Sequence, residues 1–397
     1  MNIFFVIDRF FPTDHAFLET VYSKVLPSKK DHVFFLFRTN QINDGKIYAV
    51  KKWNNSIVFL INTFGKKNIV NNFIVNLKFF FLCFYLKREK SFEIIQVRNW
   101  VWGGIVAWMM TLFGKSKFVF QHSFPREILL KEKIEKERLD KKIRAFFELQ
   151  GLKFVWKVSD AVFSISEEMK RVLTQKGVKE NKIYPVGLAF EPDKNYNVEI
   201  EKQIKNKYGL HKKETVLYFG VMDEKRNLEF LIDVWSLVTE EIDNAILLMV
   251  GGTERDVERL KSYSRRIHID NKIIFVGRVP RNEMKYYIKV ANLSVSPIPP
   301  IPLYTVSSVT KVYESLGYGC PVVGNDLPEQ GKVLRESGGG VTVKYEKKDF
   351  AKAIIRLLGN KNLEREMGER GKKWVLQNRT YGILAERITE IYKRLVN

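Results

Sequence analysis

Short runs of β-branched and aromatic residues alternate along the whole chain with longer amphipathic segments. The runs are continuously apolar, which is typical of parallel strands buried on both faces of a sheet. We therefore expect βαβ units throughout. The expected strands of a first series cover residues 3–7, 33–37, 57–61, 94–97, 117–120, 161–165 and 183–186. Those of a second series cover residues 216–219, 245–250, 272–276, 293–295, 321–323 and 341–343.

A turn-rich segment, GLAFEPDKNYN at residues 187–197, separates the two series and indicates a linker. The length of 397 residues fits two domains of roughly 100–200 residues each. We expect two doubly wound α/β domains in tandem, at residues 1–188 and 195–375. Ligands of such sheets bind beyond the carboxyl ends of the strands, so residues that follow a strand are the candidates for chemistry.

The charge and the cysteines narrow the class of protein. The chain has 67 Lys and Arg against 45 Asp and Glu, a formal net charge of +22. This surplus favours an anionic partner without choosing between nucleic acid, anionic lipid and a phosphorylated small molecule. Cys83 and Cys320 have no Cys or His neighbours at metal-ligand spacing, so we expect no zinc site and no disulfide framework, as in a reducing cytoplasm.

No membrane-crossing or export segment is expected. The N-terminal sequence MNIFFVIDRFFP contains no apolar run of signal-peptide length. The uncharged stretch Asn99–Gly114 is shorter than the ~20 residues that span a bilayer.

The clearest candidate for chemistry is the stretch SSVTKVYESLGYGCPVV at residues 307–323. Ser307, Ser308 and Thr310 can cap a helix that carries Lys311 and Glu314 on one face of its first turns. A carboxylate there can accept ribose hydroxyls, and a lysine beside a helix N-terminus can hold a diphosphate. The alternative is a capped surface helix with an ordinary ion pair.

Two further loops of the same expected sheet carry compatible residues. Within YFGVMDEKRNLEFLI, a strand ends at Gly220 and is followed by Lys225 and Arg226. Within NDLPEQGKVL, Glu329 stands just inside the next helix. Cations and fresh backbone N–H groups after strand ends are what an anion site requires.

With these motifs, the chain resembles the retaining glycosyltransferases of the GT-B fold, family 4. Glu314 and the Pro-Val-Val sequence at 321–323 match the second half of that family's paired-Glu motif, and SSVTKVYE looks like its Ser-Pro-Thr-Lys subgroup. Two positions depart from the pattern. Val306 stands where the motif has its first Glu, and Val221 where the family has an Arg; Arg226 aligns with a family Lys.

The resemblance implies two Rossmann-like domains that face an interdomain cleft. The domain at 1–188 would bind the acceptor, the domain at 195–375 the nucleotide sugar, and a last helix at 381–397 would pack back on the first domain. The activity implied is transfer of a sugar from a nucleotide-diphosphate donor to an acceptor hydroxyl with retention, in polysaccharide or glycolipid assembly. The donor-site residues implied are Gly220, Lys225, Arg226, Lys311, Glu314 and Glu329.

The same resemblance implies their roles. Glu314 would bind the ribose, Lys225 and Arg226 the departing diphosphate, and Glu329 the sugar. No metal or other cofactor is expected, because cations and helix N-termini neutralise the leaving charge. The donor phosphate itself can then take the acceptor proton.

His122 is the candidate in the first domain. It ends an expected strand in FVFQHSFP and matches a family His beside the donor sugar and the acceptor; a structural role is equally compatible with the sequence. The first loop, DRFFPTDHAFLE, lacks the paired glycines of the family and has Asp14 and His15 instead. Ser166 with Glu168 looks like a helix cap.

Two apolar segments are candidates for membrane contact. Residues 66–90 place a Phe-rich centre between basic ends, which suits an interfacial helix on anionic lipid. Residues 98–117, with Trp100, Trp102 and Trp108, are more typical of a buried helix. We therefore expect a cytoplasmic enzyme on the inner face of the cell membrane, with a glycan or a lipid-linked acceptor.

Other function classes have less support. Acidic residues such as Glu132 and Glu135 are interspersed with the basic ones, and no nucleic-acid module is recognisable. A nicotinamide dehydrogenase needs a Gly-rich fingerprint after the first strand, which is absent. A catalytically inactive GT-B partner subunit stays open because of Val221 and Val306. The sugar, the nucleotide base and the acceptor are not determined.

Overall fold

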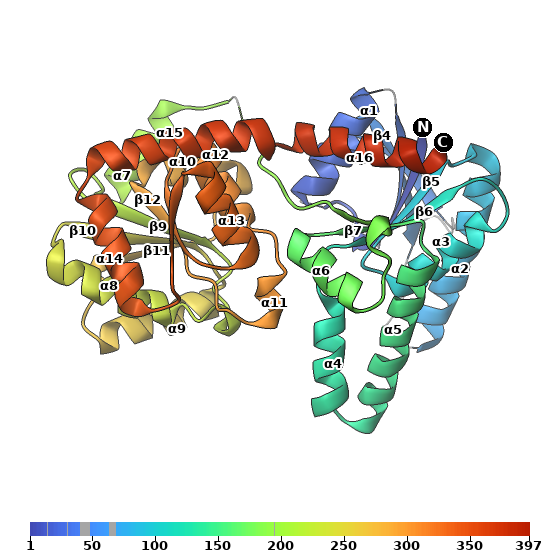
Figure 1. The fold of residues 1–397 in the computed structure, drawn as a ribbon, viewed down its shortest axis with the longest axis horizontal. Coiled ribbons are helices and arrows are strands. Elements are labelled where there is room, and N and C mark those ends of the chain that lie inside the picture. The colour runs from blue at the N-terminus through green and yellow to red at the C-terminus, as the bar shows by residue number, and fades with distance from the viewer. Residues whose placement is uncertain (14, 30, 40–47, 63–68, 194) are drawn as a thin grey trace. The chain divides into compact units, whose positions relative to one another are not determined.

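The computed structural model describes residues 1–13, 15–29, 31–39, 48–62, 69–193 and 195–397. The chain forms two compact units, and in each of them helices cover a sheet (Figure 1). Unit 1 contains Met1–Gly187 together with Tyr381–Asn397, and unit 2 contains Leu188–Thr380. The predicted α/β class with two doubly wound domains is therefore confirmed.

The sheet of unit 1 has eight strands in the order β3-β4-β2-β1-β5-β6-β7-β8. All neighbours are parallel except β3 and β4, which pair antiparallel. The strands are β1 (Asn2–Phe10), β2 (His32–Thr39), β3 (Tyr48–Trp53), β4 (Ser56–Asn62), β5 (Ile94–Arg98), β6 (Lys117–His122), β7 (Ala161–Ser164) and β8 (Ile183–Pro185).

The helices of unit 1 lie between these strands in the sequence, except for the last one, which ends the chain. They are η1 (Leu18–Val25), α1 (Leu26–Ser28), α2 (Ile69–Lys90), α3 (Val101–Thr111), α4 (Arg126–Lys136), α5 (Leu139–Val158), α6 (Glu167–Gln175), η2 (Glu180–Lys182) and α16 (Tyr381–Val396).

The last helix, α16, belongs to unit 1 although it follows unit 2 in the sequence. Its apolar face, including Ile388 at 0% exposure, is buried. The Tyr392 hydroxyl lies 3.1 Å from that of Tyr22 and donates to Gln96 of β5. Apolar burial and a buried polar network thus both attach the chain end to this unit.

The sheet of unit 2 has six parallel strands in the order β11-β10-β9-β12-β13-β14. The strands are β9 (Glu214–Gly220), β10 (Ala245–Gly251), β11 (Ile273–Gly277), β12 (Leu293–Ser296), β13 (Val322–Asn325) and β14 (Gly340–Val343). The helices are α7 (Val198–Lys207), η3 (Glu224–Arg226), α8 (Glu229–Glu241), α9 (Glu254–Arg266), η4 (Asp270–Lys272), η5 (Arg281–Glu283), α10 (Met284–Val290), α11 (Pro302–Thr305), α12 (Thr310–Gly317), α13 (Pro328–Ser337), α14 (Lys347–Leu358) and α15 (Lys361–Asn378).

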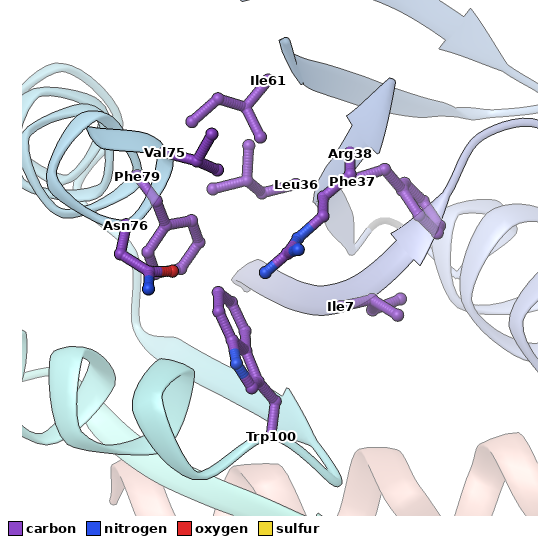
Figure 2. A pocket seen from close by; sticks show the side chains of 9 residues that line it. All are labelled: Ile7, Leu36, Phe37, Arg38, Ile61, Val75, Asn76, Phe79 and Trp100. Carbon is purple, nitrogen blue, oxygen red and sulfur yellow. The ribbon is translucent and has the colours of Figure 1, made fainter. Parts of the chain in front are cut away.

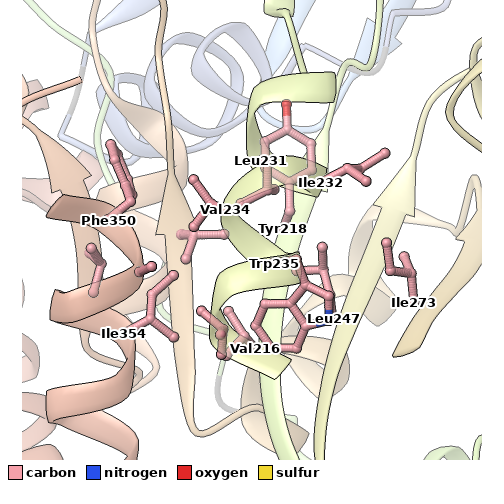
Figure 3. Packing of buried hydrophobic residues seen from close by; sticks show 14 of the residues in the cluster. Val216, Tyr218, Leu231, Ile232, Val234, Trp235, Leu247, Ile273, Phe350 and Ile354 are labelled. Carbon is pink, nitrogen blue, oxygen red and sulfur yellow. The ribbon is translucent and has the colours of Figure 1, made fainter. Parts of the chain in front are cut away.

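Alternate residues of β9 pack into two different apolar clusters, which explains the continuous apolar run in its sequence. Val216 and Tyr218 join a cluster with α8 and α14, part of which is shown in Figure 3. Leu217 and Phe219 join a second cluster with α7 and α10. When both faces of a strand are buried, successive residues are apolar, so polar and apolar residues do not alternate along it.

Every strand expected from the sequence occurs, and β3 is the strand that the sequence analysis missed. β3 is an edge strand of its sheet and reads YAVKKW, with Lys51 and Lys52 exposed. Charged side chains on an edge strand oppose pairing with other chains, but they also remove the apolar pattern by which strands are recognised.

Candidate active site

The candidate site lies in unit 2, where β9 ends at Gly220. Gly220 has a φ of +120°, in a region that side chains with a Cβ rarely adopt. A Cβ built on Gly220 would lie 2.4 Å from Cε of Lys311, which reaches over this position from α12. Glycine is therefore favoured here by its φ, and a larger residue would have to displace the Lys311 side chain.

Lys311 is held against Tyr218 of β9. Its Nζ donates to the Tyr218 hydroxyl at 3.1 Å and lies 4.3 Å from the centroid of the ring. Burial, and then the positive charge of Arg226, lower the pKa of Lys311 to about 7, although Glu314 and Asp223 act in the opposite direction. An anion placed beside this amine would favour its charged form.

Arg226 ends the short helix η3 that follows β9. Its guanidinium carbon lies 4.2 Å from the ring centroid of Tyr304 on α11. The Nε atom is buried and makes no hydrogen bond with any residue that the structure describes. The backbone is held by Asp223, whose carboxylate accepts from the Arg226 N–H at 3.2 Å. A buried donor without a partner beside a second cation is suited to bind an anionic oxygen.

Glu314 lies on α12, one turn beyond Lys311. Burial raises the pKa of its carboxyl, and the charges of Arg281 and Lys311 oppose that rise. No hydrogen bond or ion pair joins the Glu314 carboxylate to another described residue. The alternative of an ordinary Lys311–Glu314 ion pair is therefore wrong, because Lys311 bonds to Tyr218 and the carboxylate is left open to hydroxyl donors.

The expected serine and threonine caps of α12 are also wrong. The N-cap residue is Val309, and no side chain caps the helix. Ser308 instead accepts a hydrogen bond from the Leu188 N–H at 3.1 Å, and Ser307 donates to the Leu303 carbonyl oxygen at 3.0 Å. Without a side-chain cap, the first N–H groups of α12 can meet an anion.

Glu329 is placed differently from the other predicted residues. It lies in the first turn of α13 and is 4% exposed. Its Oε1 accepts from the Tyr313 hydroxyl at 2.6 Å and lies 3.5 Å from a guanidinium nitrogen of Arg379. These contacts join α12, α13 and the residue after α15. The contact with a sugar that we expected for Glu329 stays a prediction.

The remaining predicted positions of this site have no common contact. Lys225 is exposed and forms no ion pair or hydrogen bond within the described part of the chain. Val221 is 52% exposed, whereas Val306 is 3% exposed and belongs to the interior. The role predicted for Lys225 stays a prediction.

His122 lies in unit 1, at the end of β6, and is 1% exposed. Its Nε2 is 2.9 Å from a carboxylate oxygen of Glu127, and its ring lies against Trp156. Burial alone would raise the pKa of Glu127, but the hydrogen bond with His122 and the charge of Lys176 outweigh it and hold the pKa at about 2. The side chain is thus enclosed, and a catalytic role for it stays a prediction.

Asp14 of the first loop lies outside the described residues. His15 packs edge-on to Phe17, with ring centroids 6.4 Å apart. Ser166 is confirmed as a helix cap, because its hydroxyl accepts from the Met169 N–H at 3.0 Å.

Tyr218 and Tyr304 are the site residues that the sequence analysis missed. Both place an aromatic ring under a cation of the candidate site. Tyr218 lies in the expected strand at residues 216–219, and Tyr304 lies outside every expected strand and motif. Their contacts join residues far apart in the sequence, so no local pattern could identify them.

Residues 200–374 match the family model described as Glycosyl transferases group 1. The match lies within unit 2 and covers less than half of the chain, and we call residues 200–374 the group 1 domain. Gly220, Arg226, Lys311 and Glu314 all lie within the domain.

Two relatives extend this finding. An uncharacterized glycosyltransferase of Methanocaldococcus jannaschii is 22% identical over 387 residues, which are 95% of this chain and 93% of that protein. Alpha-monoglucosyldiacylglycerol synthase of Streptococcus pneumoniae is 25% identical over 204 residues, 50% of this chain and 44% of that protein.

Solved structures give the fold. Sucrose-phosphate synthase from Thermosynechococcus elongatus has a TM-score of 0.73 at 16% identity, with 100% of this chain and 99% of that chain covered. Anabaena HepE in complex with UDP has a TM-score of 0.70 at 12% identity, with 99% and 100% covered. These likenesses show a GT-B fold, and residues 200–374 are the part of it that matches the family model.

Two features are absent among the described residues. No group of three His, Cys, Asp or Glu side chains among them could hold a metal ion. None of the described helices is long and apolar enough to cross a membrane.

Proposed function

We propose that this protein transfers a sugar from a nucleotide-diphosphate sugar to an acceptor hydroxyl, with retention, as in glycosyltransferase family 4. The observation that carries the proposal is the cluster after β9, in which Lys311 and Arg226 are both held by aromatic rings. HepE, a structural neighbour, was solved with UDP and with UDP-glucose.

Each residue of the cluster has a distinct task in this reaction. Glu314 accepts the ribose hydroxyls with its open carboxylate. Lys311, Arg226 and the uncapped end of α12 neutralise the diphosphate as its charge grows during bond cleavage. Because these groups are preorganised, they need no rearrangement when the charge develops.

Nucleotide binding can be tested without an acceptor. The full chain is heated with UDP, GDP, dTDP or ADP, and a nucleotide at 100 times its dissociation constant should stabilise by ~2.7 kcal/mol. Nucleotide diphosphate release from the matching sugar donor, with a mixed acceptor extract, then tests transfer. If no nucleotide raises the melting temperature, the donor site is misplaced.

We infer that the reaction needs no metal ion, since two cations and a helix N-terminus meet the leaving group. Treatment of the full chain with EDTA should leave nucleotide diphosphate release unchanged. Loss of release with EDTA, and its recovery with Mg²⁺, would refute this inference.

A second candidate is an inactive partner subunit of the same fold. It is favoured by Val221 and Val306, which replace two polar residues of the family pattern. An inactive subunit would bind a nucleotide in the thermal assay yet release none from any sugar donor, even when Glu314 and Arg226 are intact.

The proposed location is the inner face of the cell membrane, with α2 as the contact. The side chains of Ile74, Leu77, Phe81 and Tyr85 are 41%, 44%, 62% and 52% exposed and recur every three to four residues. They form one apolar stripe on a helix whose last turn carries Arg88. This geometry suits an interfacial helix on anionic lipid, as glycolipid or cell-surface polysaccharide synthesis would need.

Membrane binding is tested by sedimentation with phosphatidylglycerol vesicles. Phe81→Ser with Tyr85→Ser should abolish co-sedimentation, whereas Leu376→Ser, at an exposed apolar position of unit 2, should not. High salt should also release the wild type, because the Debye length falls to about 3 Å at 1 M. Lys66 and Lys67, at the start of the predicted segment, lie outside the described residues.

A further inference from the structure

Unit 1 contains a cavity of 410 Å³ at the carboxyl ends of β1, β5 and β6. All of its lining residues belong to unit 1, so it shares none with the candidate site in unit 2. Its charged lining residues are Asp8, Arg9, Arg98, Arg126, Lys133 and Glu148. We call this cavity the basic pocket.

Both carboxylates of the basic pocket are already paired with arginine. Asp8 lies 2.7 Å from Nε of Arg38, and the Arg38 guanidinium lies 5.3 Å from the ring centroid of Trp100. Figure 2 shows Arg38 extending toward Trp100. Glu148 forms an ion pair with Arg126. The negative charge of the pocket is therefore neutralised within the protein.

Three cations remain without a carboxylate partner among the described residues: Arg9, Arg98 and Lys133. Arg98 has one hydrogen bond, from its Nε to the Ser123 hydroxyl at 2.8 Å. Its Nη1 is buried and has no hydrogen-bond partner in the described chain. Burial, and then the charge of Arg9, lower the pKa of Arg98 to about 10, although Tyr22 and Tyr381 act in the opposite direction. Within the described part of the chain, no carboxylate forms an ion pair with Arg98.

The wall of the basic pocket is rigid around Arg98. Asn99 and Ser123 exchange two hydrogen bonds, of 2.8 and 2.9 Å, across the ends of β5 and β6. The Arg98 guanidinium also lies 5.6 Å from the ring centroid of Phe17. A guanidinium held in this way keeps its free donor in place at little entropic cost on binding.

A second hollow of 480 Å³ shares Asp8, Arg126 and Glu148 with the basic pocket and is also lined by Trp100 and Trp102. Aromatic faces can carry the rest of a ligand whose charged group lies at Arg98. The space thus suits a molecule larger than a free ion.

We propose that the basic pocket binds a phosphate group carried by the sugar acceptor. The identification of the phosphate carrier as the sugar acceptor rests on the proposed function. Phosphate binding by unit 1 can be tested by itself. Arg9, Arg98 and Lys133 supply the charge, and the unpartnered Nη1 of Arg98 supplies a charge-assisted hydrogen bond.

The test is calorimetric titration of the full chain with inorganic phosphate at constant ionic strength. The double variant Arg9→Gln/Lys133→Gln should bind phosphate more weakly than the wild type, by up to roughly tenfold, because it loses charge-assisted contacts. The loss should not be larger, since both side chains are exposed. Lys131→Gln, an exposed lysine on α4 that does not line the pocket, is the matched control and should bind as the wild type does. Equal binding by the wild type and the double variant would overturn the proposal.

The donor site also attracts phosphate, so Arg226→Ala is titrated in parallel. If phosphate binding is lost in Arg226→Ala but kept in the double variant, the anion lies in unit 2 and the proposal is wrong. Failure of the proposed function would look different: no nucleotide would stabilise the chain, while phosphate binding would still depend on Arg9 and Lys133.

The source of the phosphate is distinguished by competition. Displacement of inorganic phosphate by soluble glycerol 3-phosphate alone supports a soluble acceptor, and displacement also by phosphatidylglycerol vesicles supports a lipid-linked one. If neither competes, the pocket does not bind phosphate esters and the proposal fails.

Discussion

Diphosphate binding should depend on pH through Lys311. In the free protein the pKa of this amine is about 7, chiefly because it is buried and then because Arg226 is close. A bound diphosphate favours the charged form and returns the pKa toward the ordinary value of 10.5. Binding above neutral pH therefore takes up one proton, and the affinity must fall as the pH rises.

The size of the effect follows from this linkage. The pKa of Lys311 is about 7 in the free protein and should lie above 9 in the complex. The dissociation constant is then proportional to one plus the ratio of neutral to charged Lys311 in the free protein. It should therefore rise about fifty-fold between pH 7 and pH 9. The phosphate groups are already about nine-tenths ionised at pH 7, because their second pKa is about 6, so their own titration changes the affinity little in this range. Burial raises the pKa of the neighbouring Tyr218, which keeps its hydroxyl protonated throughout.

The assay is titration of UDP, or of whichever nucleotide diphosphate stabilises the chain, at several pH values. Lys311→Gln should bind more weakly at pH 7 and show little dependence on pH. Lys225→Gln removes an exposed cation of the same loop and should keep the wild-type slope. A flat profile in the wild type, or an equal slope in Lys311→Gln, would refute the reasoning.

Four further substitutions test other parts of the structure. Glu314→Gln should weaken both nucleoside and nucleoside diphosphate roughly ten- to a hundredfold, as expected for charge-assisted hydrogen bonds of ~1.5–3 kcal/mol; unchanged calorimetric affinities would contradict the ribose assignment. Arg226→Ala should weaken the diphosphate but not the nucleoside in the same titrations, and turnover should fall further. Gly220→Ala should displace Lys311 and flatten the pH profile, since the added Cβ lies 2.4 Å from its Cε. Ile388→Ala on α16 should lower the free energy of unfolding of unit 1 by about 2–5 kcal/mol in a denaturant titration, and an unchanged midpoint would show that the helix is not docked.

The class of fold and the loops that carry chemistry can be predicted from the amino-acid sequence. Strands buried on both faces are continuously apolar, and this local signal identified every strand except the charged edge strand β3. Parallel strands place their carboxyl ends at one edge of the sheet, so residues after β9 and in α12 could be expected to meet. Lys311 and Arg226 do lie close enough for the charge of one to lower the pKa of the other.

The partner of each polar side chain, in contrast, depends on how the chain packs in three dimensions. Lys311 bonds to Tyr218 rather than to Glu314, and Ser308 bonds to a backbone N–H of residue 188 rather than capping α12. His122 is enclosed beside Glu127. Whether a hydrogen bond or an ion pair forms depends on differences of a few tenths of an ångström in the distance between residues far apart in the chain. The apolar pattern depends only on neighbours along the chain. The sequence therefore determined the sheets and the loops, and packing alone selected the contacts at the site.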